Sequence, residues 1–198
     1  MPVQLSIDHP SENDVQLSPR FLELSTGHIH VTGTGNVLRI ETPHIPGAAN
    51  FTLTGGTRVV VDGECNLGSI SVFALSPGVS IEIGAWTSFH GASIITAHEP
   101  ARISIGAECL VGPDCTFSAS DVHKVLDQHT RTRLNPAGDI VIGKHVWFAP
   151  RTTVLRNTTV GRECVVGVGS VLKGEYPDNS MVAGAPARVV RSGVTWEF

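Results

Sequence analysis

Hydrophobic residues in the C-terminal part of the chain recur every six positions. From Ile142 onward an aliphatic or aromatic residue returns without a gap, as Ile142, Phe148, Val154, Val160, Val166 and Leu172. Gly or Ala follows four of these six residues, and the position four after each of the first five holds Val, Thr, Thr, Cys and Ser. A period of six fits neither an amphipathic helix nor a simple β-meander, but it fits short strands separated by turns. The pattern predicts a β-solenoid.

Shorter runs in other registers carry the same pattern further toward the N-terminus. Their hydrophobic positions are Val61 and Leu67, Ile83 and Phe89, and Ile105, Val111 and Phe117. Four residues later stand Cys65 and Ser71, Thr87 and Ser93, and Cys109 and Cys115, so that with Cys164 all four cysteines share one phase. We expect Gly at the turns because they need φ > 0, and coils about 4.8 Å apart in a parallel ladder. Chance recurrence in a β-sandwich is the alternative interpretation.

The repeat divides the chain into three expected segments. Residues 1–60 lack a clean register and are expected to form irregular coils continuous with the solenoid. Residues 61–176 form the hexapeptide-repeat β-helix, and residues 177–198, with Pro177 and Pro186, form a C-terminal loop and cap. The repeat is interrupted at 121–139, a stretch rich in His, Arg and Asp. Long interruptions of a compact domain are usually functional or mobile, so this loop is the first site candidate.

Composition narrows the class of protein. Of 198 residues, 41% are hydrophobic and 16% charged, which argues against a disordered chain. Residues 1–120 carry 4 basic and 11 acidic groups and residues 121–198 carry 10 and 7, a positive excess too small to predict a nucleic-acid partner. No apolar run approaches the roughly 18 residues of a membrane span, so we expect a cytoplasmic protein without a membrane partner. The cysteines form no CxxC pair and are expected to be reduced.

Several motifs carry a resemblance to a known family over residues 79–191. The stretches SASDVH, DIVIGKHVWFAP, VVGVGSVL and AGAPARVVR are similar to those of the hexapeptide-repeat acyltransferases, in particular the O-acetyltransferases of sugars and polysaccharides. The resemblance implies an all-β fold, a left-handed parallel β-helix, assembled as a homotrimer. It also implies acetyl-CoA as the acyl donor.

The resemblance points to His123 as the catalytic residue, because it ends the SASDVH motif at the family's catalytic position. A neutral imidazole suits the removal of a proton from an acceptor hydroxyl near pH 7. Asp121 or Asp127 could orient the ring by accepting a hydrogen bond from its second nitrogen, although a backbone carbonyl would serve equally well. His129, six residues after His123, is expected to be a solvated loop residue.

Other matching positions imply where the two substrates bind. The pantetheine arm is expected to run along Ala149, Val168, Gly169 and Ser170, where small side chains would let it reach free backbone N–H and C=O groups. The basic residues Lys173, Arg188 and Arg191 could meet the phosphates or simply decorate the rim. Two positions depart from the family pattern at the expected coenzyme contacts: Lys173 is displaced by one residue, and Phe148-Ala149 replaces the usual Ile-Gly. His90 could line the acceptor cleft or fill a corner of its coil. Asp127, Arg133 and Asn135 could touch the acceptor or hold the loop.

The favoured function is direct transfer of an acetyl group from acetyl-CoA to a sugar or glycan hydroxyl, with no metal. Transfer to an amino sugar stays open. One alternative is a zinc lyase of the γ-carbonic-anhydrase type, which would need His90, His123 and His129 to converge on the metal. A second alternative is a non-catalytic binding solenoid. No motif identifies the acceptor.

Overall fold

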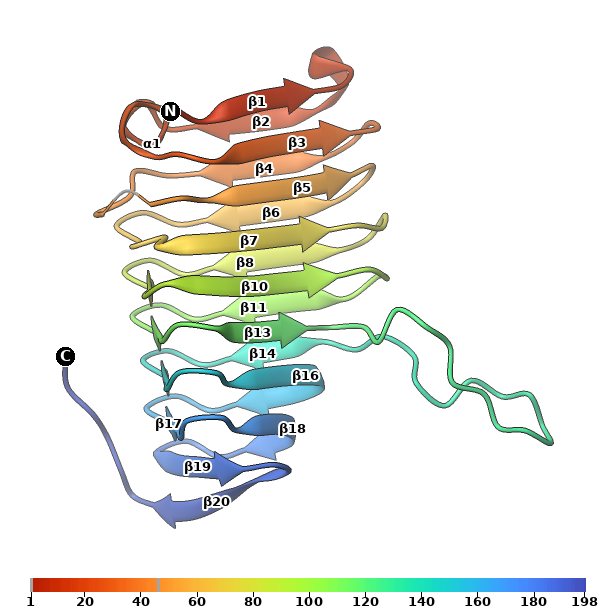
Figure 1. Cartoon of the computed structure of the whole chain (residues 1–198), viewed down its shortest axis with the longest axis vertical. Helices are drawn as coiled ribbons and strands as arrows, with labels where there is room; N and C mark the ends of the chain where they lie inside the picture. The colour runs from red at the N-terminus through yellow and green to blue at the C-terminus, as the bar shows by residue number, and fades with distance from the viewer. Residues whose placement is uncertain (1, 46) are drawn as a thin grey trace.

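The computed structural model describes residues 2–45 and 47–198 and shows a column of stacked β-coils (Figure 1). Strands of successive coils pair in parallel and form the faces of the column. The first face consists of β1 Gln4–Ile7, β3 His28–Thr32, β5 Asn50–Thr54, β7 Ser69–Ala74, β10 Ala92–Ala97, β13 Cys115–Ser118, the first half of β16 Thr153–Val160, and the start of β18 Val171–Tyr176.

Two further faces complete the column. The second consists of β2 Asp14–Leu17, β4 Val37–Ile40, β6 Arg58–Val61, β8 Ser80–Ile83, β11 Arg102–Ile105, β14 Ile140–Ile142 and the second halves of β16 and β18. The third face is narrower and consists of β9 Ser88–Phe89, β12 Leu110–Val111, β15 Trp147–Phe148, β17 Val165–Val166, β19 Ser180–Gly184 and β20 Ala187–Ser192. Earlier coils close this side through isolated bridges, such as Thr26 to Ala48 and Ile45 to Asn66.

The column is a left-handed β-helix. In Figure 1 the chain descends from the N-terminus, running from left to right along the near face and returning from right to left on the far face. Descent with this sense of rotation is left-handed, as the family resemblance implied. Fold class and parallel strand pairing are therefore confirmed.

The six-residue period marks the side chains that point into the column. Each hydrophobic residue of the main run is at most 2% exposed, and so are those of the shorter runs. Equivalent residues stack on one another from coil to coil, as Ile83 does on Ile105 and Ile105 on Ile142. Phe117 and Phe148 meet edge to face, with ring centroids 5.3 Å apart. Burial of these columns of side chains is the main stabilising contribution to the solenoid.

The glycines of the repeat have a different role from the one expected. Gly84, Gly106 and Gly143 have ordinary negative φ values, and the positive φ falls two residues later, on non-glycine residues such as Glu108 (58°) and His145 (57°). A Cβ on Gly143 would lie 2.6 Å from the backbone nitrogen of Arg162 on the next coil. The expectation that these glycines supply φ > 0 is therefore wrong. They are needed because the coils approach each other too closely for a side chain.

The cysteines share one phase, as expected, and each is buried at a corner of its coil. Every thiol contacts a backbone carbonyl of the following coil, for example Cys109 Sγ at 3.3 Å from the Gly143 oxygen. Ser71 departs from the expected phase, because it points outward from β7 while Ile70 aligns with the buried Ser93. The segment between Leu67 and β7 is one residue shorter than the six-residue period requires, so Ile70 takes the buried position.

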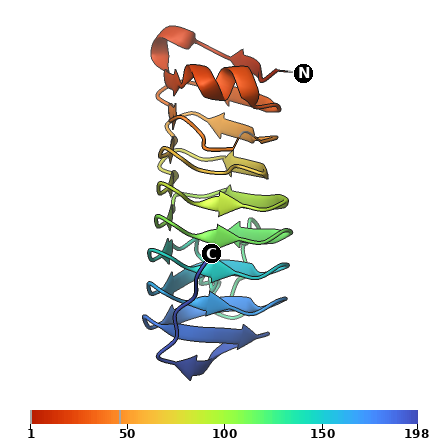
Figure 2. The same cartoon turned by 90° about the vertical axis from the view of Figure 1, so that its left-hand side faces the viewer.

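The two ends of the column are closed differently. At the N-terminal end the short helix α1 Pro19–Leu24, capped by the Ser18 hydroxyl, buries Phe21 against the first coils; a 3-10 turn spans Pro10–Glu12. At the C-terminal end β19 adds one more rung to the third face, and β20 turns back antiparallel to it. The last residues then climb along the outside of the column (Figure 2).

Candidate active site

A long loop leaves the column between the first and second faces. The chain departs after Ser118 at the end of β13 and returns at Ile140 in β14, and the loop extends well away from the coils (Figure 1). Its apolar side chains Val122, Val125 and Leu134 are 48%, 54% and 59% exposed. A loop of this size without a core of its own needs polar contacts at its base to hold a defined shape.

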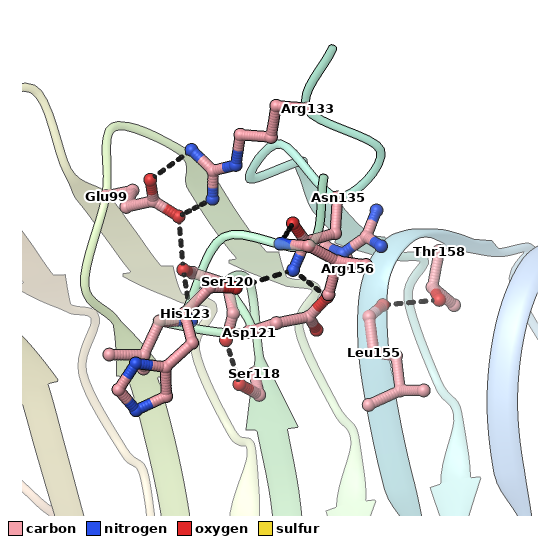
Figure 3. Close-up of polar contacts among 12 residues, drawn as sticks. Glu99, Ser118, Ser120, Asp121, His123, Arg133, Asn135, Leu155, Arg156 and Thr158 are labelled. Atoms are coloured by element: carbon pink, nitrogen blue, oxygen red, sulfur yellow. Dashed lines mark hydrogen bonds and ion pairs between the residues drawn. The ribbon is translucent and has the colours of Figure 1, made fainter. Parts of the chain in front are cut away.

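His123 lies near the base of this loop. Its backbone N–H donates to the Asp121 carbonyl, and the preceding residue, Val122, has a φ of 63°. The imidazole is exposed and points away from the surrounding polar contacts (Figure 3). Among residues 2–45 and 47–198, no hydrogen-bond partner of either ring nitrogen is found. The ring is therefore free to meet a molecule or a chain from outside.

Asp121 does not orient the imidazole within this chain. Its Oδ2 accepts from Arg156 Nε at 2.9 Å and from Asn135 Nδ2 at 3.0 Å. The hydrogen bond from Asn135, followed by that from Arg156, lowers the pKa of Asp121 below its ordinary value. The expectation that Asp121 accepts from the ring of His123 is wrong for the isolated chain, because the carboxylate is already held by these two donors.

Asp127 is likewise engaged elsewhere. Its Oδ1 accepts from the backbone N–H groups of His129 and Thr130 and from the Thr130 hydroxyl, and these bonds lower its pKa. Asp127 thus forms the turn at the far end of the loop, an arrangement typical of Asp at the start of a turn. His129 is exposed in the same turn.

Asn135 joins the two strands of the loop at its base. The side chain is 3% exposed; its Oδ1 accepts from the Val125 N–H at 2.6 Å and its Nδ2 donates to the His123 carbonyl at 2.8 Å. Nδ2 also donates to the carboxylate of Asp121, so one amide contacts the backbone at His123 and Val125 and the side chain of Asp121 before them. Of the two roles considered for Asn135, the structure shows loop-holding.

A second contact holds the loop to the preceding coil. Arg133 Nη1 and Nη2 donate to the two carboxylate oxygens of Glu99 at 2.6 and 2.7 Å, and the Ser120 hydroxyl donates to Glu99 Oε2 at 2.6 Å (Figure 3). Ser120 Oγ in turn accepts from the Val122 N–H. The hydrogen bonds from Arg133 and then Ser120 lower the pKa of Glu99 to about 2. Glu99 thus binds both segments of the loop, the outgoing one through Ser120 and the returning one through Arg133.

Glu99 and Arg156 are the positioning residues that sequence reasoning missed. Glu99 lies 34 residues before Arg133 and Arg156 lies 35 residues after Asp121, so neither pair shares a local motif. One signal was present in the sequence: Arg156 is a charged residue inside the hexad run, between Val154 and Val160. In the structure it is only 9% exposed. A charge in such a place needs a partner.

The positions predicted for the coenzyme lie at the corner between the third and first faces. Val168 is 59% exposed, and a Cβ on Gly169 would meet nothing within 4 Å, so this surface is open to an extended molecule. The backbone groups are less free than expected: the Ala149 N–H donates to the Val166 carbonyl and the Gly169 N–H to the Pro150 carbonyl. Ser170 is fully buried, with its hydroxyl donating to the Gly167 carbonyl.

His90 lies on the same edge as these positions. It follows Phe89 in the same way as Ala149 follows Phe148, and its N–H donates to the next coil, as does that of Ala149. The basic residues stand further along the column. Lys173 is exposed on β18, and Arg188 and Arg191 are exposed on β20, with Arg188 Nη1 donating to the Ala187 carbonyl.

The thiols and histidines of the described residues limit other chemistries. Burial raises the pKa of Cys65 to about 12 and that of Cys109 to about 11, which disfavours the nucleophilic thiolate. Within residues 2–45 and 47–198, no three His, Cys, Asp or Glu side chains come together as metal ligands, and His90, His123 and His129 do not converge.

None of the helices among the described residues is long and apolar enough to cross a membrane.

The left-handed coils, the hexad columns and the loop that begins in the SASDVH motif are similar to those of hexapeptide-repeat acetyltransferases, and the comparisons with known proteins find relatives of that kind. No family profile matches the sequence. Among curated proteins, the polysialic acid O-acetyltransferase of Escherichia coli O1:K1 / APEC is 30% identical over 119 residues, which are 60% of this chain and 38% of that protein. The chain thus spans well under half of that relative.

Two solved structures extend the comparison. A polySia-specific acetyltransferase has the same fold, with a TM-score of 0.81, 22% identity, and coverage of 99% of this chain and 88% of its own. A hexapeptide-repeat-containing acetyltransferase of Vibrio cholerae O1 biovar eltor, complexed with acetyl coenzyme A, is 26% identical with a TM-score of 0.51 over 63% of this chain and 64% of its own. The homologues are therefore acetyltransferases, and one of them was crystallised with acetyl-CoA.

Proposed function

We propose that this chain transfers an acetyl group from acetyl-CoA directly to a hydroxyl of a sugar or glycan, with His123 as general base. The observation that carries the proposal is the exposed imidazole of His123 on a backbone fixed by Asn135. The buried amide of Asn135 thus holds in place the backbone of a histidine whose own side chain is left free. Similarity to O-acetyltransferases of polysialic acid supports a carbohydrate acceptor.

His123 would take the hydroxyl proton as the acceptor oxygen attacks the thioester carbonyl carbon. The carbon–sulfur bond then breaks, and the imidazolium returns its proton to the leaving sulfur, so that no group of the chain is consumed. Direct attack is favoured over an acyl-enzyme because the thiols of Cys65 and Cys109 are buried with raised pKa values.

The orientation of the imidazole would come from the backbone and from outside the chain. Asp121 and Asp127 are committed to Arg156 and to the Thr130 turn, so the residues that fix His123 do so through its main chain. Hydrogen bonds to the backbone around a catalytic group hold that group within the narrow range of geometry that catalysis needs. The partner of the second ring nitrogen would then be a carbonyl or a group on a neighbouring chain.

Acetyl-CoA would lie along the corner marked by Ala149, Val168 and Gly169. The open space beside Gly169 and the exposure of Val168 fit an extended pantetheine arm, whereas the bound N–H groups of this corner leave fewer hydrogen bonds for it than the sequence suggested. Lys173, Arg188 and Arg191 are exposed toward the C-terminal end of the column and would meet the phosphates of the coenzyme.

Within one chain, His123 and this corner lie at opposite ends of the first face, which is spanned by β13. The complete site would therefore form between chains. The extended loop and its exposed Val122, Val125 and Leu134 are suited to packing against a neighbouring column. A homotrimer would place each loop against the coenzyme corner of the next chain, which is the assembly implied by the family resemblance.

The test is release of free thiol from acetyl-CoA with a panel of sugars, oligosaccharides and amino sugars. His123→Ala should reduce turnover by about 10²- to 10⁴-fold, the usual contribution of general acid–base catalysis. The matched control is His129→Ala, an exposed histidine of the same loop whose loss should change turnover by less than about threefold. Equal turnover by His123→Ala and the unsubstituted chain would remove the proposed base, and no thiol release with any acceptor would leave a binding solenoid.

A further inference from the structure

One corner of the column carries aromatic and acidic side chains in a continuous ladder. The residues with φ near 60° that precede the third face lie one above another, as Glu64, Trp86, Glu108, His145 and Glu163. The backbone N–H of each donates to the coil before it, for example Glu108 to Ala85 and His145 to Ala107, which keeps the ladder in register. This corner is distinct from the coenzyme corner at the other edge of the third face.

The C-terminal tail is fixed against this ladder. The indole of Trp196 stacks on the imidazole of His145, with centroids 4.3 Å apart and planes 8° from parallel, and its Nε1–H donates to the His145 carbonyl at 2.9 Å. The Thr195 hydroxyl donates to Glu163 Oε2 at 2.7 Å. These contacts explain the path of the tail in Figure 2 and bring the ring of Phe198 to 4.8 Å from that of Trp196.

Tail and ladder together form a shallow, open groove of about 550 Å³, lined by His44, Trp86, Ser88, Glu108, His145 and Phe198. Trp86 is 53% exposed and Phe198 76% exposed, so the groove presents ring faces to solvent. Its volume lies within the range of about 300–1,000 Å³ that is usual for small-molecule sites. Exposed aromatic faces beside hydrogen-bonding carboxylates match a pyranose ring, which has an apolar C–H face and polar hydroxyls at its rim.

The charges of the groove favour an uncharged ligand. Glu108 is paired with Lys144 at 2.8 Å, and Glu64 with His44 at 3.5 Å. The carboxylates can still accept hydrogen bonds from hydroxyls through their remaining lone pairs. Because Lys144 is already paired with Glu108, the groove offers no unpaired lysine or arginine to the carboxylate of an acidic sugar. We therefore expect this groove to bind neutral glycans more tightly than polysialic acid.

The third face connects the groove with the coenzyme corner. The ring of Trp147 lies 6.1 Å from that of Trp196, and Ala149 directly follows the strand β15 that contains Trp147. Three residues lie between His145 at one corner and Ala149 at the other, and four steps of about 3.3 Å make a distance that a few sugar rings span. We propose that this groove binds an uncharged segment of the acceptor glycan and delivers a neighbouring sugar to the transfer site. The inference rests on the proposed function for the identity of the ligand as acceptor.

The experiment measures equilibrium binding to the full chain in the absence of acetyl-CoA, so that it does not depend on turnover. Neutral hexasaccharides built on glucose, galactose and N-acetylglucosamine are compared with a sialic acid hexamer by calorimetry and by quenching of tryptophan fluorescence. We expect at least one neutral hexamer to bind more tightly than the sialic acid hexamer. Trp86→Ala and Phe198→Ala should each weaken that binding about tenfold, and Trp86→Phe should restore most of it.

Leu5→Ala is the matched control, because it removes an apolar side chain of similar exposure (49%) at the other end of the column and should leave binding unchanged. Each variant is also checked by sedimentation. The proposal is overturned if no neutral hexamer binds, if the sialic acid hexamer binds most tightly, or if Trp86→Ala binds normally. It is equally overturned if Trp86→Ala changes the oligomeric state, which would make the groove a contact between chains. Binding without thiol release would reject the enzymatic proposal and retain the glycan site.

Discussion

Substitution of Asn135 by Ala tests whether the candidate site is held from the base of its loop. The change removes the acceptor of the Val125 N–H and the donor to both the His123 carbonyl and Asp121. Apart from Ala137, which packs against it, the loop lies outside the hydrophobic core, so the substitution acts on the loop rather than on the column. We therefore expect a local effect in a chain whose global unfolding is nearly unchanged.

The magnitude follows from the three hydrogen bonds. Each of the two bonds to neutral backbone groups contributes about 1 kcal/mol, and the bond to the Asp121 carboxylate about 2 kcal/mol, giving roughly 4 kcal/mol as an upper value. Water reaches these groups once the loop opens, and Arg156 still holds Asp121, so about 2 kcal/mol is the expected loss. In hydrogen exchange this corresponds to about a 30-fold faster exchange of the Val125 amide.

The assay is amide hydrogen exchange followed residue by residue, with thermal unfolding measured in parallel. Gln128→Ala serves as control, since it removes an amide of the same loop whose side-chain contact is confined to His129 at the exposed tip. Val125 exchange should be unchanged in that variant. If Asn135→Ala leaves Val125 exchange within about threefold of the unsubstituted chain, the amide does not hold the loop and the argument for a fixed His123 backbone is refuted.

Three further predictions concern the ion pair between Glu99 and Arg133, the spacing of the coils and the buried thiols. Because the pKa of Glu99 is lowered to about 2 from an ordinary 4.5, its stabilisation of the loop is complete above pH 4.5 and is lost as the pH falls toward 2. NMR of the carboxyl carbon should show this low titration midpoint, and the midpoint should rise in Arg133→Gln. A normal midpoint in the unsubstituted chain would contradict the ion pair between Glu99 and Arg133. Gly143→Ala should lower the free energy of unfolding, measured with denaturant, by about 1–3 kcal/mol. The control Gly55→Ala, whose Cβ would lie 3.6 Å from its nearest neighbour, should lower it by less than about 0.5 kcal/mol. Equal effects of the two substitutions would show that the spacing between coils is not the constraint. Cys65 and Cys109, with pKa values raised to about 12 and 11, should resist a thiol reagent at pH 8 until the chain is unfolded, and rapid labelling of the native protein would refute their burial.

The sequence was sufficient to determine the repeating part of the fold. The inward positions of a solenoid recur at a fixed spacing along the chain, so Ile142, Phe148 and their successors could be identified as core without a structure. The same local period placed the cysteines at one buried phase. It did not reveal why glycine follows the aliphatic residue, because the close contact of Gly143 is with a residue of another coil.

Only the tertiary structure determined how the candidate site is held. Glu99 meets Arg133, Asp121 meets Arg156, and His145 meets Trp196 across 34, 35 and 51 residues. Which residues face each other from coil to coil depends on the exact length of each coil and on the loop inserted between β13 and β14, and a shift of one residue redirects a side chain to the other face. Polar partners of this kind follow no period, and therefore the residues flanking His123 and the groove beside Trp86 appeared only in three dimensions.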